Sequence, residues 1–232
     1  MIQNEYRKYE TQSAPQILEW ALTEFGSRLG VASSFGMEDM VLIDMLHKIG
    51  GDATVFTLDT GRLPEETFEI MEKTRRHYGI EIHTYFPDKD AVEQLAREKG
   101  FFSFRESVEN RKECCAIRKV EPLGRALQNL AAWVTGMRRE QGITRTDTPK
   151  VEADAAHPPL LKINPLADWT QQQVHAYIET HKVPTNALHK KNYPSIGCAP
   201  CTRPIQPGED IRAGRWWWEN PEHKECGLHR PR

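Results

Sequence analysis

The cysteines are the residues of this chain best suited to chemistry, and they are spaced unevenly. Cys114 and Cys115 are adjacent, Cys198 and Cys201 form a C-x-x-C motif, and Cys226 lies alone near the C-terminus. Four thiolates suit either zinc or an iron–sulfur cluster. Zinc ligands are normally separated by two to four residues in each half of a site, so the adjacent pair favours a cluster whose metal atoms are spread apart. On spacing alone, a zinc site and four thiols without a metal remain alternatives.

Two cations follow the adjacent cysteines directly, in the stretch CCAIRKVEPL. Arg118 and Lys119 fit the solvated face of a helix, which is the usual place for such a pair. They also fit an arrangement in which a cation offsets the negative charge of a thiolate site and reaches toward an anionic substrate. Pro122 suits the first turn of a helix. We therefore expect the cysteines and Lys119 at a junction close to the start of that helix.

Arginines gather in two other stretches, GMRREQGITR and RAGRWWW. Guanidinium groups without acidic partners suit phosphate or sulfate, because they offer paired donors in a fixed plane. Glu140 and Asp147 lie in or beside the first stretch, so ion pairs inside the protein explain its arginines equally well. The tryptophans of the second stretch either pack the C-terminal segment onto the domain or stack on a base or cation. The arginines concerned are Arg138, Arg139, Arg145, Arg212 and Arg215.

The elements that must position these residues alternate along the first two-thirds of the chain. Apolar runs predict strands over 29–34, 53–60, 80–86, 131–139 and 159–165, and amphipathic stretches predict helices over 37–49, 64–79, 90–100, 121–130 and 168–183. In the first helix, Met40, Val41, Ile43, Met45 and Leu46 form an apolar stripe. The alternation predicts an α/β fold, with an open, mostly parallel twisted sheet and helices on both faces.

Small and polar residues follow the first two predicted strands. The stretch SSFGMED places Ser33, Ser34 and Gly36 before a helix N-terminus, whose free N–H groups attract anions. The stretch LDTGRLPEET places Asp59 and Thr60 at the same edge of the sheet. A nucleotide fits there, although ordinary turn chemistry explains the same composition. The motif G-x-x-x-x-G-K-[ST] is absent, which excludes a Walker-type phosphate loop.

Two parts of the chain lack such periodicity. Residues 136–159 hold few large apolar side chains and are expected to form a long loop. After Pro184 the chain is rich in proline and glycine, so something other than its own core must hold it. We expect a nucleotide-binding α/β domain over residues 1–200, which carries most of the cysteine site, and an irregular C-terminal tail over residues 201–232.

The composition limits the classes of function. A formal net charge of −2 and a pI near 6.5 argue against a protein that binds nucleic acid through bulk positive charge. The chain has no run of eighteen apolar residues and its N-terminal stretch is polar, so the sequence predicts neither a membrane span nor a secretory signal. A cytoplasmic location is the default expectation, and thiols there stay reduced unless they do chemistry or hold metal.

Taken in order along roughly residues 30–230, these motifs resemble the assimilatory sulfonucleotide reductases of the PAPS/APS reductase family, thioredoxin-dependent adenylyl-sulfate (APS) reductases in particular. The matching stretches are SSFGMED, LDTGRLPEET, CCAIRKVEPL, TGMRREQGITR, YPSIGCAPCTRPI, DIRAGRWWW and KECGLH. The resemblance implies an adenine nucleotide α-hydrolase-like fold and a [4Fe–4S] cluster on Cys114, Cys115, Cys198 and Cys201. It also implies a redox-active cysteine near the C-terminus, here Cys226.

The same resemblance implies a reaction in assimilatory sulfate reduction and cysteine biosynthesis. The Cys226 thiolate attacks the sulfur of adenosine 5′-phosphosulfate (APS) and expels AMP, which leaves a thiosulfonate on the enzyme. A thioredoxin or glutaredoxin-like dithiol then releases sulfite. His229 is a candidate to orient or deprotonate the thiol, or a solvent-exposed residue without a role. The residues expected to bind substrate are Ser33, Ser34, Phe35, Gly36, Asp39, Leu58, Asp59, Thr60, Lys119, Gly136, Arg138, Arg139, Arg145, Arg212 and Arg215.

Several alternatives remain open. Family members strictly specific for 3′-phospho-APS (PAPS) lack the cluster cysteines, which favours APS, but some cluster-bearing members accept both. SSFGMED has one glycine where related PP-loop ATP pyrophosphatases have two adjacent ones, which leaves a PP-loop ATP-dependent sulfur-transfer enzyme as a weaker alternative. A zinc-stabilised binding module, in which Cys226 is incidental, is another. The sequence does not fix the oligomeric state, although family members commonly self-associate.

Overall fold

A mostly parallel sheet forms the centre of the fold. The structure, a computed structural model, describes residues 6–142 and 144–220. The six strands found within these residues stand in the order β3-β2-β1-β4-β6-β5, and neighbours are parallel except β5 and β6. Five of them confirm the predicted strands. Their bounds are Leu29–Ala32 for β1, Thr54–Leu58 for β2, Ile82–Tyr85 for β3, Ala132–Val134 for β4, Val151–Ala153 for β5 and Leu161–Ile163 for β6.

The strand order reverses beside β1. From β1 the chain adds β2 and then β3 on one side, and it returns to place β4 on the other side. Val31 of β1 accordingly pairs with Val55 of β2 and with Val134 of β4. Open α/β sheets bind their ligands at such a reversal, outside the carboxyl ends of the strands. The topology therefore places a binding crevice beside the turns that follow β1 and β4.

β5 corrects the expectation of a long loop over residues 136–159. It runs antiparallel to β6, with Val151 opposite Ile163, and forms one edge of the sheet. Of its three residues, Val151 alone is buried. A strand of this length shows too little alternation to be recognised in the sequence, and its pairing with β6 makes it a strand.

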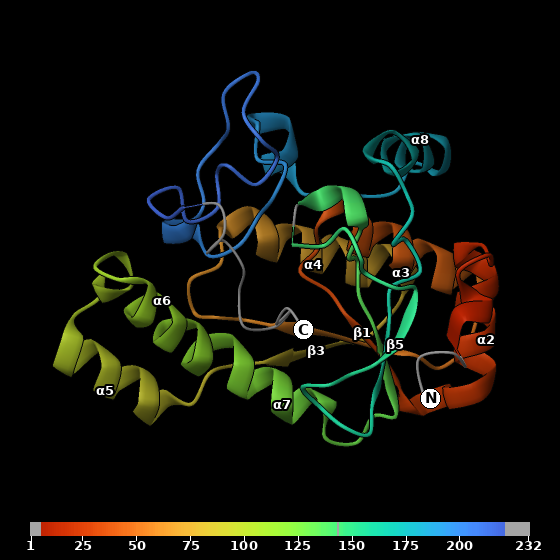
Figure 1. Ribbon diagram of the computed structural model, residues 1–232, viewed down its shortest axis with the longest axis horizontal. Helices are drawn as coiled ribbons and strands as arrows, with labels where there is room; N and C mark the ends of the chain where they lie inside the picture. The colour runs from red at the N-terminus through yellow and green to blue at the C-terminus, as the bar shows by residue number, and fades with distance from the viewer. Residues whose placement is uncertain (1–5, 143, 221–232) are drawn as a thin grey trace.

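Helices cover both faces of the sheet, as predicted. Their bounds are Ala14–Phe25 for α2, Met37–Ile49 for α3, Glu65–Tyr78 for α4, Lys89–Lys99 for α5, Val108–Cys115 for α6, Glu121–Leu127 for α7 and Gln171–His181 for α8. Figure 1 shows α3 and α4 on one side of the strands and α7 on the other. α6 and α7 are joined by a π-helical segment, η4 (Ala116–Val120), so Lys119 lies at a junction inside one helical stretch. α2 and α6 are not among the predicted helices.

Alternate residues of the strands pack against different helices. Val55 and Val134 belong to the core cluster that α2, α3 and α8 share. Their neighbours Phe56 and Trp133 belong to a second cluster, with Leu123 of α7. Side chains along a strand point alternately to its two faces, so both faces of this sheet are covered. Strands buried on both faces are continuous apolar runs, which explains why the sequence predicts them.

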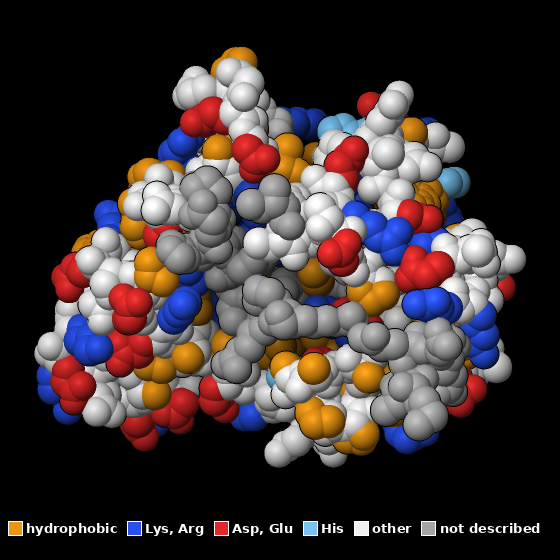
Figure 2. Space-filling model, in the orientation of Figure 1, with side chains coloured by type: hydrophobic (Ala, Val, Ile, Leu, Met, Phe, Trp, Pro, Cys, Tyr) orange, Lys and Arg blue, Asp and Glu red, His pale blue; other side chains and the backbone are white. Residues whose placement is uncertain are grey.

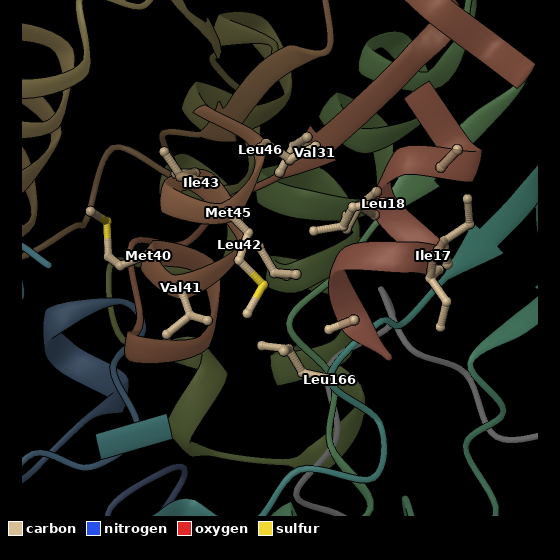
Figure 3. Close-up of a cluster of buried hydrophobic side chains, with 14 of the residues drawn as sticks. Ile17, Leu18, Val31, Met40, Val41, Leu42, Ile43, Met45, Leu46 and Leu166 are labelled. Carbon is tan, nitrogen blue, oxygen red and sulfur yellow. The ribbon is translucent and has the colours of Figure 1, made fainter. Parts of the chain in front are cut away.

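α3 is buried around most of its circumference. All eight residues from Asp39 to Leu46 are buried, where the sequence predicts one apolar stripe. Figure 3 shows side chains of α3 leaving the helix in several directions, with Leu18 of α2 on one side and Leu166 on another. The five residues of the predicted stripe are all buried, and the buried surface extends beyond them because α3 packs against both α2 and α8.

The irregular segment after α8 packs onto the rest of the fold. Two 3₁₀ helices, η6 (Ala187–Lys191) and η7 (Ala199–Cys201), punctuate this segment, which is blue in Figure 1. Thr202 and Arg215 form an isolated β-bridge, and Trp216 is buried among the cysteines. The predicted boundary after residue 200 therefore passes through a packed part of the chain, and a separate tail over residues 201–232 stays a prediction.

The surface carries charges of both signs. Figure 2 shows Lys and Arg side chains interspersed with Asp and Glu over one face, in keeping with the net charge of −2. Among the described residues, no helix combines the length and the apolar character needed to cross a membrane.

Candidate functional site

A pocket of about 240 Å³ opens at the carboxyl edge of the sheet. Small-molecule sites are typically somewhat larger, roughly 300–1,000 Å³, so it suits a compact ligand. The ends of β1, β2 and β4 line it, together with the start of α3 and the segments 194–198 and 211–216. The predicted site residues that line it are Ser33, Ser34, Gly36, Asp39, Leu58, Thr60, Lys119, Gly136, Arg145, Arg212 and Arg215.

One wall of the pocket is apolar. Phe56, Leu123 and Trp133 belong to the buried cluster on the α7 side of the sheet, and Ala32 and Leu58 pack against it. All five residues line the pocket. Flat aromatic groups pack well against such a surface. This wall therefore suits a heterocyclic base.

The turn after β1 is held by a buried carboxyl group. Asp39, in the first turn of α3, accepts hydrogen bonds from the Ser34 N–H at 2.6 Å and the Ser34 hydroxyl at 2.8 Å. Burial raises the pKa of Asp39 to about 6, although the two bonds from Ser34 act in the opposite direction. Gly136, after β4, lies so close that an added Cβ would stand 2.5 Å from Asp39 Oδ1. Glycine at 136 thus allows the two turns to meet.

Phe35 lies between these pocket residues, but its side chain points elsewhere. Its φ is 59°, in the left-handed region, and its ring is buried in the core cluster with α2 and α3. Such a conformation costs on the order of 1 kcal/mol or more, which the buried ring offsets. The side chain therefore anchors the turn and does not line the pocket, which corrects the prediction that it contacts substrate.

The turn after β2 connects the pocket with the cysteines. Thr60 Oγ1 lies 3.2 Å from Cys198 Sγ, and the Thr60 carbonyl accepts a hydrogen bond from Arg118 Nη1 at 2.6 Å. Asp59 lies outside the pocket lining, and its Oδ1 accepts the Gly61 N–H at 2.8 Å. Asp59 therefore shapes the turn, as the alternative based on turn chemistry predicts.

Two predicted arginines are occupied inside the protein. Arg138 is fully buried and donates to Glu38 at 2.8 Å, to Glu140 at 3.0 Å and to other acceptors. Arg139 donates to Glu10 Oε2 at 2.6 Å. Neither lines the pocket. These contacts agree with the alternative of internal ion pairs, and binding of an anionic substrate by Arg138 and Arg139 stays a prediction.

A cationic wall faces the apolar one. Lys119, Arg145, Arg212 and Arg215 all line the pocket. Arg145 is held by Gln141, whose Oε1 lies 2.6 Å from its Nη1. Arg215 donates to the Ile196 carbonyl at 3.1 Å and lies so close to Gly197 that a Cβ there would collide with its guanidinium. Lysine and arginine side chains in a partly enclosed pocket attract phosphate and sulfate groups.

The four predicted ligand cysteines come together beside this wall. Cys114 and Cys115 end α6, Cys198 directly precedes η7, and Cys201 is the last residue of η7. Each is between 7% and 9% exposed, and none of the four forms a disulfide. They share an apolar cluster with Leu95, Phe104 and Trp216. The structure thus brings two pairs that lie about 80 residues apart into one buried site.

Three of these thiols, those of Cys114, Cys198 and Cys201, differ in the direction of their pKa shift. Burial raises the pKa of Cys201 to about 12 and outweighs the nearby cations at Cys114, whose pKa is also raised. Burial acts in the same direction at Cys198, but Lys119, the Thr60 hydroxyl and Arg215 outweigh it, so its pKa lies below the ordinary value. Of these three thiols, only Cys198 has nearby cations that outweigh burial and favour the thiolate.

Several buried donors in this region point to an absent acceptor. Among the described residues, Arg118 Nε, Arg215 Nε, Trp216 Nε1 and Trp218 Nε1 are buried without a hydrogen-bond partner. Leaving such donors unpaired costs about 1–3 kcal/mol each. No group of three or more His, Cys, Asp or Glu side chains in residues 6–142 and 144–220 is arranged to hold a single metal ion. Four thiols, cations and unpaired donors fit an anionic iron–sulfur cluster.

Other lining residues were not predicted. Glu38 follows the turn after β1 and binds the buried Arg138, which no local sequence signal indicates. His189 donates from Nδ1 to the Tyr193 carbonyl at 2.9 Å, and its buried Nε2 has no partner among the described residues. Its position nine residues before Cys198 was the only available hint. Cys226 and His229 lie outside the described residues, so their roles stay predictions.

The chain is similar to known proteins over most of its length. The model of a family described as the phosphoadenosine phosphosulfate reductase domain matches residues 28–204. The adenosine 5′-phosphosulfate reductase of Allochromatium vinosum is 56% identical over 86% of this chain and 77% of that protein. The reductase of the same name from Burkholderia cepacia is 51% identical over 91% and 86%. The crystal structure of phosphoadenylyl-sulfate (PAPS) reductase from Candida auris, a phosphate complex, matches with a TM-score of 0.73 and 29% identity, over 87% of this chain and 96% of that one.

Proposed function

We propose, from the premise that the chain belongs to the phosphoadenosine phosphosulfate reductase family, that it reduces adenosine 5′-phosphosulfate (APS) to sulfite and AMP. The two curated relatives described above are named for this substrate. The structural observation that carries the proposal is one pocket with an apolar wall and a cationic wall, next to four buried cysteines. The chain is accordingly an oxidoreductase of sulfate assimilation.

The two walls divide the substrate between them. The adenine packs against Phe56, Leu58 and Trp133, which offer an apolar surface and little hydrogen bonding. The phosphosulfate extends to Lys119 and Arg215, whose charges match its own. This orientation turns the sulfur toward the cysteine side of the pocket. It also leaves the ribose beside the turn after β1.

The same turn supports APS over PAPS. Glu38 and Asp39 both line the pocket there, and Asp39 is held in place by Ser34. A 3′-phosphate on the ribose adds two negative charges next to these carboxyl groups. Repulsion between like charges in a partly enclosed site is costly, so we propose that the chain prefers the substrate without the 3′-phosphate.

Chemistry begins with the thiolate of Cys226. It attacks the sulfur of APS, an S–S bond forms, and the bond from sulfur to the phosphate oxygen breaks, so that AMP leaves with the electron pair. The enzyme then carries Cys226–S–SO₃⁻. A thiolate of a partner dithiol attacks Cys226 Sγ and expels sulfite, and the second partner thiolate displaces Cys226 from the mixed disulfide. The partner dithiol is oxidised by two electrons and the sulfur of APS is reduced.

Positive charge is needed because both reactants of the first step are anions. Lys119 and Arg215 reduce the repulsion between thiolate and phosphosulfate, and they stabilise the charge that develops on the departing phosphate. Lys119 lies on η4, only four residues after Cys115. The fold of the cysteine site therefore determines where this charge stands.

We assign the residues Cys114, Cys115, Cys198 and Cys201 to a [4Fe–4S] cluster, as the donor set and the unpaired buried donors support. When bound, the cluster supplies negative charge and cross-links α6 to η7. Its protein surroundings then hold Lys119 and Arg215 at the pocket. The electrons for the reaction come from the partner dithiol, so the residues around the cysteines serve positioning and electrostatics.

We further propose a thioredoxin or glutaredoxin-like protein as the reductant, because each turnover consumes one dithiol. A reducing compartment such as the cytoplasm keeps both that dithiol and the four buried thiols reduced. Sulfite formed there enters cysteine biosynthesis. We expect neither nucleic acid nor membrane as a partner, and self-association of the kind common in the family stays a prediction.

Anaerobic sulfite release from APS and from PAPS, with reduced thioredoxin, tests the function. The wild type is expected to release sulfite from APS faster than from PAPS. Cys226→Ser is expected to bind AMP and retain iron and sulfide while its turnover disappears. Absence of sulfite from APS with the cluster-loaded protein would overturn the function. Retained turnover in Cys226→Ser contradicts the thiosulfonate route, and equal rates with PAPS contradict only the specificity.

A further inference from the structure

A deeply buried ion pair joins α6 to the last described residues of the chain. The side chains of Arg111 and Glu219 are 1% and 3% exposed. Arg111 Nε donates to Glu219 Oε1 at 2.9 Å, and Arg111 Nη2 donates to Glu219 Oε2 at 2.8 Å. Two parallel bonds between planar groups fix orientation as well as distance. The pair therefore determines both where Glu219 stands and how it is oriented.

The same guanidinium group contacts the cysteine site. It stacks over the ring of Trp216, 4.7 Å from the ring centre, and Trp216 shares one buried cluster with the four cysteines. Arg111 and Cys115 are four residues apart on α6, so they share one face of the helix. One side chain thus connects the cysteine site with the end of the C-terminal segment.

The pair is a poor device for stability alone. Removing two charges from water costs several kcal/mol per ion, and apolar residues of similar volume are often as stabilising as a buried pair. What the pair supplies is geometry. Glu219 precedes the predicted nucleophile Cys226 by seven residues, a stretch that spans at most about 25 Å. If Glu219 moves, the space that the Cys226 thiol can reach moves with it.

We propose that Arg111 and Glu219 are positioning residues, which fix the last described residues of the chain, shortly before Cys226 in the sequence, relative to the cysteine site. Neither residue lines the pocket, although Trp216, on which Arg111 stacks, does, so we expect them to act mainly on the thiol. The role of Cys226 rests on the proposed function. The anchoring itself is measurable without turnover.

Glu219→Gln is the most informative variant, because it preserves the shape of the side chain and removes its charge. Glu209→Gln is the matched control. Arg203 and Glu209 also form a bidentate pair in the C-terminal segment, with both bonds at 2.8 Å, but both side chains are 32% exposed. The control therefore breaks the same kind of pair where both side chains are far more exposed.

Three measurements on the cluster-loaded full chain separate positioning from general damage. They are the iodoacetamide alkylation rate of Cys226 by peptide mapping, the dissociation constant of AMP, and the single-turnover rate of AMP release from APS. For Glu219→Gln we expect an altered alkylation rate and a single-turnover rate lowered about ten- to hundredfold, because misplacements near 1 Å cost about that much. Its AMP affinity and iron content should match the wild type. Glu209→Gln should match the wild type throughout.

The outcomes distinguish this proposal from the function on which it rests. Unchanged alkylation and single-turnover rates in Glu219→Gln overturn the positioning role, as does a rate loss that parallels loss of iron. Arg111→Lys provides a second variant, which keeps one charge and should fall between the wild type and Glu219→Gln. If the wild type releases no AMP from APS while Glu219→Gln still changes the alkylation of Cys226, the anchor stands and the proposed function fails.

Discussion

Two buried polar regions of the molecule are built in opposite ways. In the first, the Asp44 carboxylate of α3 accepts bonds from Tyr177 at 2.7 Å and Tyr78 at 3.1 Å, and it pairs with Lys48 at 2.7 Å. Burial works against ionisation of Asp44, but Lys48 and Tyr177 outweigh it, so its pKa lies below the ordinary value. The protein supplies every partner that this carboxylate needs.

In the cysteine region, by contrast, several buried donors have no partner in the described part of the protein. Arg118, Arg215, Trp216 and Trp218 each bury an N–H donor without a partner in the described part of the chain. Burial raises the pKa of two of the thiols there. Unpaired buried donors beside cations have a cost that folding alone does not explain. The Asp44 region thus satisfies its own buried groups, whereas the unpaired donors of the cysteine region support the proposed cluster.

Substitution of one cysteine should have the largest effect of all on the cysteine region. We expect Cys198→Ser to lose iron and labile sulfide and to abolish sulfite formation, because a cluster ligand and the Thr60 contact disappear together. Asp44→Asn should keep its full iron content. Iron and sulfide analysis of both variants under anaerobic conditions checks this. Full iron content in Cys198→Ser would show that the thiols are not ligands.

Lys119→Ala should have the next largest effect. Loss of one cation that stabilises the developing charge is expected to lower kcat/KM for APS about 10²–10³-fold. Lys48→Ala, which removes the lysine of the Asp44 region, should leave kcat/KM unchanged. Steady-state kinetics of the two variants decides this, and equal losses would show that Lys119 acts through stability.

The Asp44 region should respond in stability rather than in activity. Asp44→Asn is expected to lower the free energy of unfolding by about 1–3 kcal/mol at neutral pH, because the hydroxyl groups of the buried Tyr78 and the half-buried Tyr177 lose a charged acceptor. The folded-state pKa of Asp44 lies below its ordinary value of 3.8, so this contribution is complete above that pH and is lost as the pH falls through the folded pKa.

Urea unfolding of wild type and Asp44→Asn at several pH values measures this contribution. The gap between the two proteins should close toward acid pH, while iron content and sulfite formation at neutral pH stay the same. A gap that is independent of pH would mean that the charge of Asp44 contributes nothing.

Some features of the fold and the site can be predicted from the sequence, and others cannot. Strands such as Thr54–Leu58 and the grouping of the four cysteines can be predicted, because burial on both faces and motif spacing leave local patterns. β5 cannot be predicted, since its three residues carry no periodicity and only the pairing with β6 makes them a strand. The partners of Arg138 are hidden for the same reason, because Glu38 is 100 residues away and only the fold brings it within 2.8 Å.

Two tryptophans, one with a hydrogen-bond partner for its Nε1 and one without, predict the smallest effect. Trp133 Nε1 donates to Asp154 at 2.9 Å, whereas the buried Trp218 Nε1 has no partner among the described residues and packs against the cysteine cluster. Trp133→Phe is expected to lower the free energy of unfolding, because Asp154 loses a donor. Trp218→Phe removes no hydrogen bond within the described protein, so its effect should appear where the bound group is the acceptor.

The rate at which a chelator removes iron therefore distinguishes the two variants. Trp218→Phe should release iron about two- to fivefold faster than the wild type, the effect of one hydrogen bond worth roughly 0.5–1 kcal/mol. Trp133→Phe should release iron at the wild-type rate once both are compared at the same fraction folded. Equal release from both variants would show that the unpaired donor does not bind the cluster. Faster release from Trp218→Phe alone would identify the missing acceptor of the cysteine region as the cluster itself.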